Sequence, residues 1–303
     1  MAKFIKKVLL FFALIAIVDI VCGFGFSYLR SHAKGGDTQK NYYISEQCCD
    51  DILILGSSRA ARHYDPKVLE DSLGFSCYNC GEPGCGIITA YARYGMITNR
   101  HNPQLIIYEV SPKFDYFKSD DYSKYLGRIR QYAYKSSVKD LFVDLGDNLE
   151  GIRLISNMYK NNSFVFQNVL DNVTEGELDR GYEPLFGVLK PDKQKRPPYN
   201  EQVMDSLKYS FIEKLIIESQ HNNIKLIFMA SPQYCNLSES KELDTEYDAI
   251  IELCKFHHVP FFNHTFIEGL SDNYRLFQDY KHLNQEGARV YTRLICDEIK
   301  EYM

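Results

Sequence analysis

Residues 51–59 read Asp-Ile-Leu-Ile-Leu-Gly-Ser-Ser-Arg, and this stretch decides the class of fold. Its apolar run has the length and composition of a strand that is buried on both faces. Gly56 allows the chain to turn tightly after that strand, and Ser57 and Ser58 are favoured residues at the start of a helix. A buried strand that passes through a glycine turn into a helix is the opening unit of a parallel α/β sheet.

The same alternation recurs along the chain. Four further short apolar runs have the length of buried strands, and helical stretches lie between them. This pattern predicts an α/β fold, a three-layer α/β/α sandwich with a five-stranded parallel, flavodoxin-like sheet. The last expected helix has an apolar stripe that should pack on the sheet. The expected strands are residues 51–55, 76–79, 105–110, 224–229 and 259–263, the expected helices are residues 65–73, 87–99, 201–219, 244–257 and 284–302, and the stripe is Ala288, Tyr291, Ile295 and Ile299.

Residues 111–200 interrupt this rhythm, because they supply no clear pair of strand and helix. An insertion after the third strand lies at the carboxyl end of the sheet, where open α/β folds bind their ligands. Its many aromatic residues either stack on sugars or form a small satellite core. We therefore expect residues 50–303 to form one domain with an insertion at residues 111–200, preceded by a linker at residues 31–49.

The N-terminus carries a separate apolar segment. Residues 8–29 contain a single charge, Asp19, and a helix of that length spans a hydrocarbon core of about 30 Å. The apolar side chains outweigh the cost of inserting one carboxylate. A cleaved signal peptide has a shorter apolar region and a small-residue cleavage site, which is hard to find here. Residues 1–30 are therefore predicted to form an uncleaved transmembrane anchor.

Charge sets the expected orientation and excludes one class of partner. Lys3, Lys6 and Lys7 form a denser cluster than the basic residues after the apolar segment. This asymmetry predicts a single-pass membrane protein with a cytoplasmic N-terminus and an extracytoplasmic catalytic domain. The formal net charge of −5 lacks the surplus of cations that nucleic-acid binding requires, so nucleic acid is not expected as a partner.

Nine cysteine residues are spread over the chain, and their pairing is left open by the sequence. Cys77 and Cys80, with Cys85, could form half of a zinc site, but no second pair of ligands with matching spacing follows. They are better explained as small apolar residues of a strand and a loop. We expect no structural metal and no cofactor.

Two groups of polar residues carry the candidate chemistry. One is the serine pair after the first strand, where backbone N–H groups at the start of a helix can face a developing negative charge. The other is Asp279 and His282, three positions apart before the last helix. That spacing lets the carboxylate orient the imidazole and leaves the second ring nitrogen free to accept a proton. Each group alone also fits a helix cap, but together on an α/β sheet they predict nucleophilic catalysis.

With these residues the sequence resembles the SGNH, or GDSL-like, hydrolase superfamily. Gly56-Ser57-Ser58 is similar to the first block of that family, Gly-Asp-Ser, and this places the nucleophile on Ser58. The last block, Asp-x-x-His with a Leu-Asn-x-x-Gly continuation, matches the chain from Asp279 onward. The resemblance implies that Ser58 attacks, that His282 takes its proton and that Asp279 holds the imidazole.

The two middle blocks are less regular. Residues 79–84 are similar to the second block, which implies an oxyanion hole formed by the backbone N–H groups of Ser58 and Gly84, with Gly81 as the alternative to Gly84. Residues 110–115 depart from the third block, because the usual Asn donor is missing. Loss of one donor typically costs about 100- to 1,000-fold in rate. Either the insertion supplies a replacement or turnover is slow.

The resemblance implies a serine-dependent hydrolase of acyl esters, expected to act on cell-envelope carbohydrate at the membrane. Alginate O-acetyltransferases and the D-alanyl transfer protein of teichoic acids are membrane-anchored relatives that also depart from the standard blocks. An O-acyltransferase that works with a membrane acyltransferase partner is therefore the alternative. Two non-enzymatic alternatives are an SGNH-like binding module, which has no need of both Asp279 and His282, and an assembly protein whose Asp19 contacts a membrane partner.

Three more polar residues are candidates for substrate binding. Arg59 and His63 lie on the helix that begins at Ser58, where they either neutralise an anionic substrate group or belong to a solvated face. Glu109 ends the third expected strand, where it either binds substrate or hydrogen-bonds a neighbouring turn.

Overall fold

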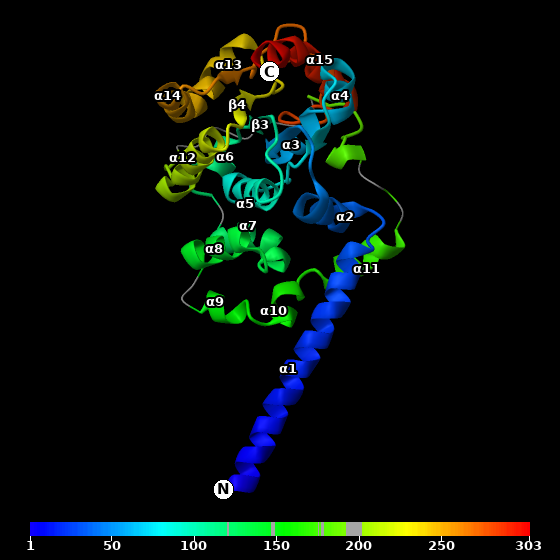
Figure 1. Ribbon diagram of the computed structural model, residues 1–303. Coiled ribbons are helices and arrows are strands. Elements are labelled where there is room, and N and C mark those ends of the chain that lie inside the picture. The colour runs from blue at the N-terminus through cyan, green and yellow to red at the C-terminus, as the bar shows by residue number, and fades with distance from the viewer. Residues whose placement is uncertain (120, 147–148, 175, 177–178, 192–201) are drawn as a thin grey trace. The chain divides into compact units, whose positions relative to one another are not determined.

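The computed structural model describes residues 1–119, 121–146, 149–174, 176, 179–191 and 202–303 (Figure 1). The chain divides into two compact units. The first contains residues 1–47 and 122–178, and the second contains residues 48–121 and 179–303. The sheet and every candidate catalytic residue therefore belong to the second unit, whereas a large part of the expected insertion belongs to the same unit as the N-terminal helix.

Five parallel strands form the sheet of the second unit, in the order β2-β1-β3-β4-β5. Each strand overlaps one of the apolar runs in the sequence, so the predicted sheet is confirmed. The chain leaves β1 for β2 on one side and then crosses to β3 on the other, which is the switch point where such sheets bind ligands. The strands are β1 Ile52–Gly56, β2 Cys77–Asn79, β3 Leu105–Glu109, β4 Lys225–Ala230 and β5 Phe261–Asn263.

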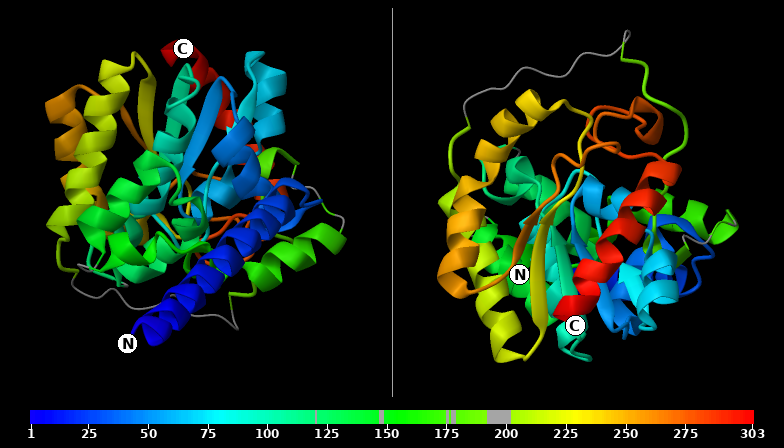
Figure 2. Two further views of the ribbon diagram at one scale, coloured as in Figure 1. Left: turned by 60° about the horizontal axis from the view of Figure 1, so that its bottom comes forward. Right: turned by 90° about the horizontal axis from the view of Figure 1, so that it is seen from above.

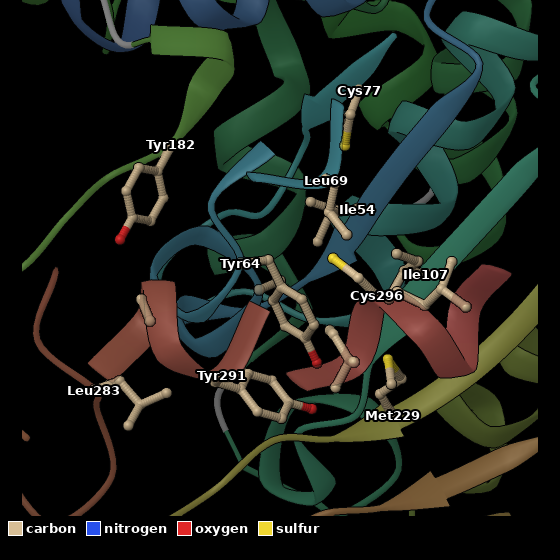
Figure 3. Close-up of a cluster of buried hydrophobic side chains, with 14 of the residues drawn as sticks. Ile54, Tyr64, Leu69, Cys77, Ile107, Tyr182, Met229, Leu283, Tyr291 and Cys296 are labelled. Carbon is tan, nitrogen blue, oxygen red and sulfur yellow. The ribbon is translucent and has the colours of Figure 1, made fainter. Parts of the chain in front are cut away.

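Helices cover both faces of this sheet (Figure 2). On one face, α4 (Pro66–Leu73) and α15 (Gln285–Tyr302) pack against each other and share a core with β1, β3 and β4, part of which is drawn in Figure 3. On the other face, α5 (Ile87–Thr98) packs against α12 (Ser206–His221). The predicted stripe of α15 is confirmed, because all four of its side chains are buried: Ala288, Tyr291, Ile295 and Ile299.

Side-chain caps fix where several helices begin. Asp65 accepts a hydrogen bond from the Lys67 N–H at the start of α4, and Asn284 accepts one from the Gly287 N–H at the start of α15. Asp205 caps α12, so this helix begins later than the sequence pattern suggests; residue 201 of the expected range lies outside the described residues. The expected helix at residues 244–257 is divided by a 3₁₀ turn, Thr245–Tyr247, between α13 (Leu237–Asp244) and α14 (Asp248–His257).

The first unit is helical in its described residues. Its longest element is α1 (Ala2–Ser31), which is long and apolar enough to cross a membrane. The stretch expected as a linker carries α2 (Gly36–Tyr42) and a π-helix, Tyr43–Gln47. In the described residues of this unit the insertion forms five short helices: α7 Tyr122–Ile129, α8 Ser136–Leu145, α9 Glu150–Arg153, α10 Asn157–Asn161 and α11 Val165–Val173.

Some of the aromatic residues of the insertion help to form a satellite core. Tyr125 and Tyr132 are buried together with Leu141 and Phe142 of α8. Buried rings cannot stack on a ligand, so these tyrosines serve packing rather than sugar binding. Cys77, Cys80 and Cys85 of the second unit are buried as well, as expected of small apolar residues.

Candidate active site

The turn between β1 and α3 (Ser58–His63) presents one of the two adjacent serines. Gly56 adopts a φ of +133°, and a Cβ atom there would lie 2.4 Å from the Glu109 carbonyl oxygen, so only glycine fits this close approach. Ser57 then starts the helix, where its carbonyl accepts the Ala61 N–H, and its side chain is fully buried. Ser58 is only half-buried, which makes its hydroxyl the accessible one of the pair.

The second element of the site is the loop before α15. Asp279 and His282 do not lie on a helix; the Asp279 carboxylate closes the loop by accepting the N–H groups of Lys281 and His282 at 2.7 and 2.9 Å. The Gln278 N–H donates in turn to the His282 carbonyl. This closed loop brings the Asp279 Oδ2 atom to 2.8 Å from the His282 Nδ1 atom.

Ser58 and His282 meet although 224 positions separate them: the Ser58 Oγ atom lies 2.8 Å from the His282 Nε2 atom. A carboxylate only accepts, so the Nδ1–H of His282 donates to Asp279 and Nε2 is left to accept the Ser58 hydroxyl proton. Burial alone would raise the pKa of Asp279, but the hydrogen bond and charge of His282 and two backbone N–H groups hold it below its ordinary value. Asp279 is therefore an ionised partner for the imidazole at neutral pH.

The loop after β2 distinguishes the two candidate glycines. The Gly81 N–H donates to the Asn79 Oδ1 atom at 3.0 Å, so it is already used. Among the described residues, the backbone N–H groups of Gly84 and Ser58 have no hydrogen-bond acceptor. The Glu82 N–H donates to the Gly56 carbonyl and ties this loop to the turn that carries Ser58. Gly84 and Ser58 thus retain the free donors that an oxyanion hole requires.

The residues in place of the usual third block serve packing. After β3, residues 112–115 form the short helix α6 (Pro112–Asp115). Asp115 is fully buried, accepts the Tyr108 hydroxyl at 2.8 Å and also accepts the Ser111 N–H. Burial raises the pKa of Asp115 to about 7. This carboxylate holds α6 against the sheet and leaves the position without an amide donor.

The structure does not place Arg59, His63 and Glu109 where a substrate could reach them, nor on a solvated helix face. All three are buried. The Arg59 Nε atom lies 3.0 Å from the Glu109 Oε1 atom, and the guanidinium also donates to the Val110 carbonyl. The side of α3 that carries Arg59 and His63 faces the carboxyl ends of β3 and β4. The polar side chains on these elements therefore pair with one another.

His63 belongs to a chain of hydrogen bonds that ends on the loop of His282. The Leu283 N–H donates to the His63 Nε2 atom at 3.0 Å, so the proton of His63 lies on Nδ1 and donates to the Ser231 Oγ atom at 2.8 Å. The Ser231 hydroxyl donates onward to Glu109. Sequence reasoning missed Ser231; its position immediately after β4, at the carboxyl end of the sheet, was the available signal.

We expect acid to destabilise the fold through His63. Burial, with neighbouring His282, Arg59 and Arg62, lowers the pKa of His63 well below its ordinary value. Below about pH 6.5, His63 is therefore protonated in the unfolded chain but still neutral in the folded chain. The free energy of unfolding then falls by up to about 1.4 kcal/mol per pH unit until the pH reaches the pKa of His63 in the folded chain. His63→Gln should reduce the slope of unfolding free energy against pH between 7 and 5; parallel slopes in urea titrations would refute this.

These contacts define a class of protein: a doubly wound α/β domain with a serine, a histidine and a carboxylate in hydrogen-bond sequence at the carboxyl end of its sheet. No family model matches the chain, and no curated protein matches it. Several solved structures are similar in fold. One, from Bacteroides fragilis, is described as "a putative acylhydrolase"; it is 12% identical with a TM-score of 0.41, over 86% of this chain and 93% of that one.

Another solved structure is described as "a putative lipolytic protein of G-D-S-L family" from Desulfitobacterium hafniense. It is 10% identical with a TM-score of 0.39, over 82% of this chain and 98% of that one. At this level of similarity neither structure carries an argument about activity. The function has to be argued from the residues themselves.

Proposed function

We propose that the protein is a serine-dependent esterase of the SGNH type. The observation that carries this proposal is the unbroken hydrogen-bond sequence from the Ser58 Oγ atom through His282 to Asp279, with distances of 2.8 Å at both steps. A binding module would need neither the alignment nor the ionised carboxylate. The half-buried positions of all three residues leave the serine open to a substrate and to water.

The geometry supports a two-step acyl transfer. Ser58 attacks the ester carbonyl while its hydroxyl proton moves to the His282 Nε2 atom, and Asp279 stabilises the imidazolium that results. The Ser58 and Gly84 N–H groups stabilise the oxyanion. Nε2 then returns the proton to the leaving alcohol, which leaves an acyl group on Ser58. Water, or the hydroxyl of an acceptor, releases the acyl group by the same steps in reverse order.

The proposed substrate class depends on where the catalytic domain lies in the cell. We propose that α1 is an uncleaved membrane anchor and that the body of the protein lies outside the cytoplasm, where acylated carbohydrates of the cell envelope are the accessible esters. A hydroxyl acceptor in place of water would make the protein an O-acyltransferase, which would then depend on a membrane acyltransferase for its acyl donor. Both reactions pass through the same acyl-Ser58 intermediate.

The direct test of this activity is release of acetate from a small acetyl ester and from an acetylated polysaccharide by the full-length protein. An esterase should release acetate from at least one of them, and mass spectrometry during turnover should find the acetyl group on Ser58. Absence of release from both, with no acetylated Ser58 in the presence of a carbohydrate acceptor, would contradict the proposal.

The proposed orientation predicts the behaviour of a fusion at the C-terminus. A reporter that is active only in the cytoplasm, placed after Met303, should be silent. The same fusion without residues 1–31 should be active, because the apolar segment and its flanking lysines direct the body across the membrane. Activity of the full-length fusion would show that the body stays in the cytoplasm.

The proposed role of Gly84 calls for a change that removes only its N–H group. Gly84 has a φ of +73°, which proline cannot adopt, so Gly84→Pro would rebuild the loop as well. Replacing Gly84 by glycolic acid exchanges the N–H for an ester oxygen and keeps the backbone freedom. We expect the rate of acyl transfer to fall on the order of 100-fold with an unchanged melting temperature. An unchanged rate would assign the second donor to another group.

A further inference from the structure

The helices α9 to α11 of the insertion have inverted polarity. In residues 149–173, all of which the structure describes, Leu154 is the one apolar side chain that is buried, whereas four buried side chains are polar: Glu150, Asn161, Asn168 and Asp171. Most of the exposed side chains in the same stretch are apolar. An exposed apolar surface of this kind is unfavourable in water and is typical of a face that contacts a membrane or another protein.

Helix α11 shows the inversion most clearly. Its apolar residues at spacings of three and four form one exposed face: Phe166, Val169, Leu170 and Val173. The opposite face is held inward by hydrogen bonds, since Asp171 accepts the Thr38 N–H at 2.9 Å and Asn168 accepts the Thr38 hydroxyl at 3.0 Å. These bonds fix the rotation of the helix, so its apolar face cannot turn away from the surroundings.

The segment before α11 presents a second apolar row. Leu149, Ile152, Ile155 and Met158 recur at a spacing of three residues across α9 and α10, and all four are exposed. Together with the exposed face of α11 they form what we call the apolar rows of the insertion. The helices α9, α10 and α11 thus expose apolar side chains on their outer surface.

Asp19 fastens these helices to the apolar helix α1. Its carboxylate accepts hydrogen bonds from the Ser156 hydroxyl at 2.6 Å and from the backbone N–H groups of Asn157 and Met158 at 2.8 and 2.9 Å, at the start of α10. Asn172 of α11 donates to the Leu29 carbonyl at 2.7 Å. Figure 1 shows the result: α10 and α11 lie beside the C-terminal half of α1, and its N-terminal half projects freely.

Asp19 therefore helps to fix how the insertion and α1 meet. A carboxylate in an apolar helix is costly unless hydrogen-bond donors satisfy it, and here the donors come from the same chain. The hydrogen-bond partners of Asp19 thus lie in the same chain, whereas the alternative of an assembly protein assigned them to a second protein in the membrane. The apolar rows and the exposed apolar side chains of α1 thus belong to helices that are bonded to one another.

We infer that the apolar rows of the insertion lie in the lipid bilayer beside α1. Lipid is favoured over a protein partner because Asp19 and Asn172 tie these helices to α1, which is long and apolar enough to cross a membrane. A helix that is bonded to a membrane span on one side and apolar on its other side meets acyl chains there. This inference rests on α1 as a membrane span and is independent of the catalytic residues.

Lipid contact can be tested by fluorescence quenching, because the chain contains no Trp. Single-tryptophan variants of the full-length protein would be placed in nanodiscs of ordinary or brominated phosphatidylcholine. Phe166→Trp reports on the apolar rows, and Leu14→Trp on the free part of α1. Phe256→Trp is the matched control in the second unit, because Phe256 and Phe166 are both 76% exposed.

Brominated lipid should quench Phe166→Trp and Leu14→Trp strongly and Phe256→Trp hardly at all. Quenching at Leu14 without quenching at Phe166 would overturn the inference while the anchor stands, and a blue-shifted, unquenched Phe166→Trp would identify a protein as the cover. Equal quenching at Phe166 and Phe256 would indicate adsorption of the whole protein and would overturn it too. Absence of quenching at Leu14 would remove the anchor itself.

Discussion

Ser58→Ala and His282→Ala should each abolish nearly all esterase activity, and the double variant should be scarcely less active than either single variant. The serine supplies the attacking oxygen and the imidazole takes its proton, so neither acts without the other. In triad enzymes the loss of the serine or of the histidine alone is on the order of 10⁶-fold in kcat, about as much as the loss of all three members. The measurement is kcat/KM for a small acetyl ester, with the melting temperature of each variant as a control for folding.

The additivity of these losses separates catalysis from binding. If Ser58 and His282 only held a ligand, their effects on turnover would be small or would multiply in the double variant. Ser57→Ala is the matched control, since this adjacent hydroxyl is buried and contacts neither His282 nor Asp279 in the described structure. Wild-type rates in Ser58→Ala and His282→Ala would assign the activity to another site.

Asp279→Asn should lower the rate by roughly 10,000-fold while the fold remains intact. The amide oxygen of asparagine can still accept the Lys281 and His282 N–H groups that close the loop. Its amide NH₂ group would donate to the imidazole Nδ1 atom, which forces the proton onto Nε2. An Nε2–H group cannot accept the Ser58 proton, so the tautomer is wrong although the geometry is retained.

The expected signature of Asp279→Asn is a loss in kcat with little change in melting temperature. Asp279→Ala is the informative companion, because it also removes the acceptor for the loop and should lower the melting temperature as well. A rate in Asp279→Asn within a few-fold of the parent protein would mean that the carboxylate is not needed to orient His282.

Much of the fold could be predicted from the sequence because its signals are local. A buried strand followed by Gly56 and two serines specifies its own turn, and the apolar stripe of α15 specifies the face that meets the sheet. The pairing of Asp279 with His282 is also local, since three residues separate them. These features need no knowledge of distant parts of the chain.

The surroundings of the site could not be predicted in the same way. The sequence leaves open whether Arg59 and Glu109 bind substrate. In the structure they are buried against each other, and Glu109 accepts the N–H of Ser231 in the turn after β4, which only the assembled sheet decides. The bond from Leu283 to His63 likewise joins segments 220 positions apart. The part of the insertion from α9 to α11 was harder still, because most of its apolar residues face outward and the usual pattern of an apolar interior does not apply.

The central claim, that Ser58 is an activated nucleophile, is tested most directly by covalent labelling with a fluorophosphonate probe. The probe reacts with a serine whose hydroxyl is activated by a neighbouring base, and peptide mass spectrometry locates the adduct. The account predicts a single adduct on Ser58, unchanged in Ser57→Ala, strongly slowed in His282→Ala and absent in Ser58→Ala. Failure of the folded protein to react, or an adduct on a residue other than Ser58, would contradict it.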